Sequence, residues 1–130
     1  MAIATQMATI PTLVLALSAG ADLSSDQHKF VKLNADNQVI LCAAATDKPL
    51  GILQNKPDAS GKGAEVIVIG VSKVQADEAL SAGDVIGTSA DGQAKVSVAT
   101  EYPMGQVIIG AANAAEIAEV VINAANPVLL

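Results

Sequence analysis

The amino-acid sequence predicts a mainly β protein: a small single-domain β-barrel or β-sandwich with an extended N-terminal arm and at most one or two short helices. Length and composition support this, because 130 residues form one domain and a hydrophobic content of 52% fills a sizeable core. Glycine, asparagine and aspartate also recur at short intervals. The stretches between them are rich in β-branched residues, which is typical of an all-β domain.

The chain begins with an uncharged arm. Residues 1–11 carry no charged side chain, and Ile3, Met7 and Ile10 are interspersed among small and polar residues before Pro11. Arms of this kind fold poorly alone and lie readily along another chain, where they add backbone hydrogen bonds. We therefore expect an extended arm that binds a partner, with a disordered terminus as the alternative. The β-rich domain then comprises residues 12–130.

Short strands are predicted directly after the arm. Residues 12–17 form the first strand, and a loop follows it. Residues 29–33 and 39–42 lie on either side of a turn rich in Asn and Asp and predict a hairpin. Residues 50–53 predict a short strand, in which Gly51 indicates a bulge or a close approach of two backbones.

A long central strand is predicted in the middle of the chain. Residues 55–63 precede it, and their Pro, Gly, Ser and Asp content predicts a mobile surface loop. The run at 65–74 is too continuously apolar for a strand with one solvated face. We therefore expect a strand that is covered on both faces, with a bend at Gly70.

A further hairpin is predicted downstream of the central strand. Residues 77–84 fit either a helical turn or a tight turn that feeds the next strand. Asp91 and Gly92 then lie between strands at 85–88 and 94–98. Because Asp-Gly readily takes the positive φ values of a type I′ turn, we expect that turn here.

The last third of the chain fits two structures. Residues 111–119 have high helix propensity, but they lie between β-branched segments at 106–110 and 120–122. A hairpin with an Ala-rich connection is the preferred prediction, and a helix of one or two turns is the alternative. No internal repeat of the solenoid kind is recognised.

The chain ends in an apolar tail formed by Val128, Leu129 and Leu130. Exposed on a monomer, these side chains would form an uncovered apolar patch. The tail is therefore expected either to close the core or to enter a subunit contact. The candidate partner interface consists of Ile3, Met7, Ile10, Pro11, Val128, Leu129 and Leu130.

The composition argues against several kinds of binding. Seven lysines, no arginine and 13 acidic residues give a net charge of −6, which repels phosphate backbones, so no direct binding of nucleic acid is expected. One cysteine and one histidine cannot supply a common zinc site, and the aspartates do not follow the EF-hand pattern. No metal or other cofactor is expected.

The composition also argues against catalysis. His28 lies in a polar segment and is expected to be exposed, whereas Cys42 lies in an apolar run and is expected to be a small buried side chain. These two residues therefore do not supply a nucleophile paired with a general base, and the protein is not expected to be an enzyme. Lys73 lies between hydrophobic residues, as in lipoyl and biotinyl carriers, but its mid-strand position argues against a carrier.

No targeting or membrane segment is recognised. The apolar residues 10–19 lack the basic region that precedes the apolar stretch of a signal peptide, and Pro11 interrupts them. No apolar run approaches the roughly 18 to 20 residues that span a bilayer. The sequence therefore predicts a soluble protein made in the cytoplasm, without a membrane partner.

Several segments together resemble the head decoration or capsid cement proteins of tailed bacteriophages. They are the uncharged start rich in Ala and Thr, KPLGI at 48–52, VIVIGV at 66–71, LSAGDVIG at 80–87, GQVIIG at 105–110 and the closing VVI at 120–122. The likeness covers residues 47–122 and consists of strand rhythm and turn placement.

The resemblance implies a compact β-barrel or β-sandwich, often a homotrimer, that binds the outside of an assembled head and clamps junctions between major capsid protein subunits. We therefore expect a non-enzymatic virion protein on the outer capsid surface, synthesised in the host cytoplasm. Weak contacts suffice for this role, because a trimer that engages several subunits gains from effective concentration. The alternatives are another phage structural component, such as a fibre or tail protein, and a small cytoplasmic ligand-binding or carrier β-barrel.

Overall fold

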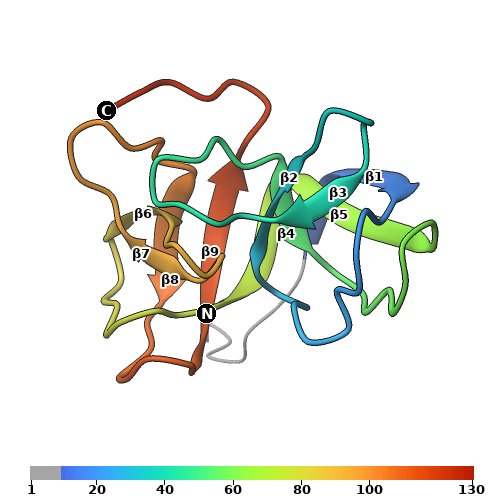
Figure 1. Cartoon of the computed structure of the whole chain (residues 1–130). Coiled ribbons are helices and arrows are strands. Elements are labelled where there is room, and N and C mark those ends of the chain that lie inside the picture. Colours follow the sequence, from blue (N-terminus) through green and yellow to red (C-terminus); the bar gives the residue numbers. More distant parts are fainter. Residues whose placement is uncertain (1–9) are drawn as a thin grey trace.

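The computed structural model describes residues 10–130, which form an all-β domain with no helix in this range. The strands are β1 (Ile10–Ser18), β2 (Phe30–Leu33), β3 (Val39–Leu41), β4 (Gly51–Leu53), β5 (Gly63–Gln75), β6 (Val85–Thr88), β7 (Ala94–Val96), β8 (Gly105–Ile109) and β9 (Ile117–Asn123). They form one strongly curled antiparallel sheet, a half-barrel, in the order β3-β2-β4-β5-β9-β8-β6-β7, with β1 beside β5 (Figure 1). The predicted small β domain is confirmed.

The predicted strands and hairpins are largely confirmed. β2 and β3 form the expected hairpin, in which Lys32 lies opposite Ile40. β8 and β9 pair in antiparallel fashion, so the Ala-rich segment between them is a connection and not a helix. The segment before β6 is a tight turn, because Asp84 donates its N–H to Ser81 O.

The turn between β6 and β7 differs from the predicted type I′ turn. Gly92 has a φ of 75°, but Asp91 does not share the positive φ that a type I′ turn needs. Ser89 donates its N–H to Gln93 O, and Gly92 donates its N–H to Ser89 O. The connection is therefore a loop of three residues, one more than the two of a type I′ turn. Its last residue is a glycine in the left-handed conformation.

β5 is the central strand, as predicted. β1 pairs with one edge of its first half, and β4 pairs with the opposite edge. β9 pairs with the second half, from Ile69 to Gln75. Gly70 lies at the joint with a φ of 146°, a conformation that is available almost only to glycine. One bent strand thereby runs through both halves of the molecule.

The two halves of the molecule repeat the same arrangement. Module A consists of β1 to β4 and the first half of β5, and module B consists of the second half of β5, β6 to β8, and β9. In each module a hairpin pairs with a short strand, which pairs in turn with the next long strand. A parallel bridge closes each module, between Ala19 and Val39 in module A and between Ala76 and Ala94 in module B.

The strand registers of the two modules also match. Corresponding pairs are Phe30–Ile52 and Val85–Gln106, Ile52–Ile67 and Gln106–Val121, and Leu33–Val39 and Thr88–Ala94. Short motifs recur at matching places, with AEVIVI at 64–69 and AEVVIN at 118–123, and PLG at 49–51 and PMG at 103–105. The sequence prediction missed this duplication, because the shared motifs are short and the residues between them differ.

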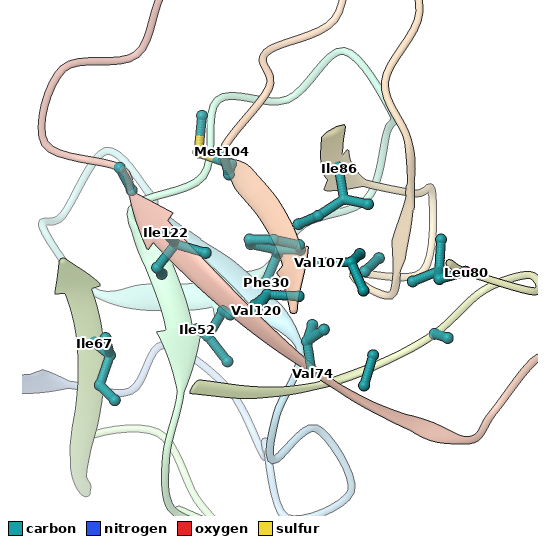
Figure 2. Packing of buried hydrophobic residues seen from close by; sticks show 14 of the residues in the cluster. Phe30, Ile52, Ile67, Val74, Leu80, Ile86, Met104, Val107, Val120 and Ile122 are labelled. Carbon is teal, nitrogen blue, oxygen red and sulfur yellow. The ribbon is translucent and has the colours of Figure 1, made fainter. Parts of the chain in front are cut away.

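Each module has its own hydrophobic core cluster. The module A cluster consists of Ala19, Leu23, Val31, Val39, Leu53, Ala64 and Val66. The module B cluster includes Ile86, Val107 and Val120. It also contains Phe30, Ile52 and Ile67 from the outer face of module A (Figure 2). Apolar packing therefore joins the two modules into one domain.

Candidate interaction surface

The predicted arm residues lie at the start of the described chain or before it. Ile3 and Met7 lie outside the described residues. Ile10 is the first residue of β1, where it lies opposite Val71 and is 60% exposed. Pro11 lies opposite Gly70 in the same strand pair. The described end of the arm is therefore part of the edge of the sheet.

The predicted tail residues lie beside a different part of the molecule. Val128, Leu129 and Leu130 are 63%, 54% and 56% exposed, so their side chains do not close the core. The tail backbone is nevertheless anchored, because Leu130 donates its N–H to Glu101 O and accepts the N–H of Thr100. The tail is therefore held by the loop at 98–101, whereas the described end of the arm is held by β5.

A row of side chains crosses the outer face of the sheet. Residues that lie opposite each other in paired strands are on the same face. Ile10 lies opposite Val71, Val71 opposite Val121, Val121 opposite Gln106 and Gln106 opposite Val85. Val85 and Val121 are 46% and 41% exposed. The sequence prediction missed this row, because the strands that carry it are too continuously apolar to mark their exposed positions.

A groove lies along this row where β6, β8 and β9 meet. It has a volume of about 450 Å³ and is lined by Val85, Pro103, Met104, Gly105, Gln106, Val121, Ile122 and Asn123. None of the lining side chains is charged, although the protein as a whole has a net charge of −6. An uncharged, mainly apolar groove is suited to contact with another protein surface.

β1 is an edge strand without charged residues. Among the described strands it pairs with β5 alone. Its sequence is IPTLVLALS, and Leu13 and Val14 are 38% and 44% exposed. Edge strands usually carry charges or other devices that prevent pairing with a second chain. The edge of β1 that is unpaired among the described strands is therefore another candidate contact, next to the outer row.

Ion pairs fix the loops around this surface. Lys95 Nζ lies 2.6 Å from Glu101 Oε1, and Glu101 also accepts the N–H of Val98. The hydrogen bond from Lys95, opposed by partial desolvation, holds the pKa of Glu101 below its ordinary value. Since the tail backbone binds residues 100–101, this ion pair also fixes the place where the tail is anchored.

Replacing Glu101 with glutamine is expected to lower stability at neutral pH by about 1 kcal/mol, because a charge-assisted hydrogen bond is lost. A carboxyl group with a depressed folded pKa stabilises the protein above its unfolded pKa and loses this contribution as the pH falls through the folded value. The difference from wild type should therefore shrink below about pH 4. Urea denaturation at pH 7 and pH 3 measures it, with Asp58→Asn in the exposed pair with Lys62 as the control. An equal difference at both pH values would contradict the assignment.

The two residues considered for catalysis have different surroundings. Cys42 is fully buried, as predicted, and desolvation raises the pKa of its thiol to about 12. His28 was predicted to be exposed, but it is half-buried, because its backbone is held between two strands. Its N–H binds Leu53 O, and its carbonyl accepts the N–H of Gln75. Burial, followed by nearby lysine charges, lowers the pKa of His28, so the ring is neutral at physiological pH.

The remaining candidates are a carrier lysine and a metal site. Lys73 lies within β5, as predicted, near the end of that strand and opposite Glu119, whereas a carrier lysine would lie at a hairpin tip. Within residues 10–130, no group of three or more His, Cys, Asp and Glu side chains is placed to hold a metal ion. The same residues contain no helix of the length and apolarity needed to cross a membrane.

A solved structure has the same fold as this chain. The head fiber gp8.5 N base in bacteriophage phi29, a crystal structure, matches with a TM-score of 0.66 and 15% sequence identity. The match covers 86% of this chain and 96% of that chain. At this level of identity the likeness shows a common fold. No protein-family model and no curated protein matches the sequence.

Proposed function

We propose that the protein is a non-enzymatic structural component of a bacteriophage head. It binds the outer surface of the assembled capsid and stabilises junctions between major capsid protein subunits. The observation that carries this proposal is the fold shared with a protein described as a phage head fiber base. The uncharged edge of β1 and the apolar outer row support it, because both are suited to contact with other protein chains.

The proposed contacts are individually weak. The chain has one Phe, one Tyr and no Trp, and these aromatic residues usually anchor small, tight interfaces. Association through small aliphatic side chains therefore needs several contacts at once. A homotrimer that engages several capsid subunits provides them through effective concentration. The acidic net charge keeps particles that display many copies from associating with each other.

Removing residues 1–9 is expected to weaken capsid binding at least tenfold, while leaving β1 complete. Burial of Ile3 and Met7 in a partner stabilises the complex by roughly 1.5 to 3 kcal/mol each, before the cost of ordering the arm. Co-sedimentation of the purified protein with undecorated capsids, over a range of concentrations, measures the affinity. Circular dichroism should show an unchanged β domain.

A full-length protein with Thr5→Ala and Thr9→Ala serves as the control for this truncation. It keeps the apolar arm residues and should bind like wild type. If the truncated protein binds capsids as tightly as the control, the arm has no part in attachment. If no variant and no wild-type protein binds, the capsid proposal itself is rejected.

A second candidate function is the base of a head fibre. It is favoured by the structural neighbour, which is itself the N base of a head fiber. Electron microscopy of native phage particles, with this protein located by antibody labelling, distinguishes the two, because a decoration protein forms low knobs and a fibre base lies at the foot of a long projection. Mass spectrometry of the purified chain tests the carrier alternative, which requires a covalent adduct on Lys73.

A further inference from the structure

The packing of the two modules within one chain is a template for contact between two chains. Phe30 on the outer face of module A is fully buried and donates its N–H to Gly92 O in the β6–β7 turn. Ile52 and Ile67 lie on the same face and are 0% and 1% exposed. All three side chains belong to the cluster that module B completes (Figure 2). The outer face of module A is therefore covered by module B.

Within residues 10–130, module B presents the same face without such a cover. By strand register, Val85, Gln106 and Val121 of module B correspond to Phe30, Ile52 and Ile67 of module A. Val85 is 46% exposed and Val121 is 41% exposed, although their counterparts are buried. All three module B residues line the groove of about 450 Å³. The groove thus lies where a further module would pack.

The hairpin that covers module A also has an exposed counterpart. In the β6–β7 hairpin, Thr88 is 2% exposed and Gly92 is buried. At the corresponding places of the β2–β3 hairpin, Leu33 is 44% exposed and Asn37 is exposed. Asn37 has a φ of 62° and Gly92 a φ of 75°, so both turns end in the same left-handed conformation. The tip of the β2–β3 hairpin therefore has the backbone form that already packs against module A.

We infer that the outer face of module B binds the β2–β3 hairpin of a second copy of this chain. The arrangement is the one that the β6–β7 hairpin has on module A. Val85 takes the place of Phe30 and donates its N–H to Asn37 O of the second copy, and Leu33 of that copy takes the place of Thr88. This inference names the two faces that join the copies in the self-association of the proposed function. The part of it that concerns assembly on a capsid rests on that proposed function.

This contact joins two different faces, so it is heterologous and runs head to tail. A heterologous contact closes into a ring when the rotation between copies allows it, and a homotrimer would place its modules alternately around the axis.

Val85 is smaller than Phe30, and Gln106 is polar where module A has Ile52. The contact between copies therefore buries less apolar surface than the contact between modules, and self-association should depend on concentration.

Two single substitutions test the inference on the isolated protein. Val85→Asp disrupts the module B face, and Leu33→Asp disrupts the hairpin face; Val98→Asp is the control, since Val98 is 55% exposed and outside both faces. Each disruptive change should raise the dissociation constant at least about 100-fold, because an unpaired carboxylate is buried in the contact. Light scattering after size-exclusion chromatography should give the wild-type mass for the control and a monomer for either disruptive variant.

Mixing the two disruptive variants is the decisive measurement. Each keeps the face that the other has lost, so an equimolar mixture should form a one-to-one dimer and nothing larger. A mixture that stays monomeric, a monomeric wild type, or wild-type assembly by either variant would overturn the inference. Circular dichroism confirms that the variants are folded. No capsid is present, so failure here leaves the capsid proposal standing, and failed capsid binding leaves this result intact.

Discussion

An alanine at Gly51 is expected to destabilise the protein by at least about 3 kcal/mol, which is a large share of the stability of a domain of this size. The added Cβ would overlap the carbonyl oxygen of Ile67 and lie 2.8 Å from Cγ1 of Val66. Both residues belong to β5, which cannot move away without breaking its pairing with β4. The sequence predicted either a bulge or a close approach of two backbones at Gly51, and the structure shows the close approach.

Gly63→Ala is the matched control for this change. An added Cβ at Gly63, the first residue of β5, meets no atom within 4 Å. Its free energy of unfolding should stay within about 0.5 kcal/mol of wild type. Urea denaturation followed by circular dichroism compares the two variants directly. Equal stability of Gly51→Ala and Gly63→Ala would show that β4 and β5 are not packed as described.

Replacing Phe30 with alanine is expected to lower the free energy of unfolding by about 3 to 5 kcal/mol, because a large buried side chain leaves a cavity. Phe30 is the only phenylalanine, is 0% exposed and lies in the cluster shared by both modules. The loss should fall mainly on the joint between the modules. Hydrogen exchange should then become faster in module B than in module A, whose own cluster does not contain Phe30.

Val98→Ala provides the comparison for Phe30→Ala. Val98 is 55% exposed, so its truncation should cost less than about 1 kcal/mol. Denaturation of both variants under identical conditions gives the difference. A loss at Phe30 no greater than the loss at Val98 would mean that the ring does not join the modules.

Local sequence signals predicted the strands and most connections correctly. Turn-forming residues between β-branched runs located the β2–β3 and β6–β7 hairpins, and the unbroken apolar run located β5. These features depend on neighbouring residues, so a single sequence contains them. The turn type at Asp91 and the exposure of His28 were predicted wrongly. The length of the loop explains the turn type, and backbone hydrogen bonds to β4 and β5 explain the partial burial of His28.

The candidate surface was only partly predictable. The uncharged start of the chain indicated Ile10 as a candidate contact residue, and the apolar residues of the tail indicated a second candidate contact. Val85 and Val121 were missed, although they line the groove. Nothing in their neighbourhood distinguishes them from buried valines. Their exposure depends on which face of each strand points outward and on the absence of a covering hairpin within the described residues.

The sequence alone determined that this chain forms a β domain with an aliphatic core, an acidic surface and few side chains suited to chemistry, because composition and period-two patterns are local properties. The tertiary structure alone decided that the strands form two matching modules around one bent β5, and that one outer face is covered while its counterpart is exposed. The physical reason is that register and burial arise from pairing between distant segments, whose partners a linear pattern does not specify.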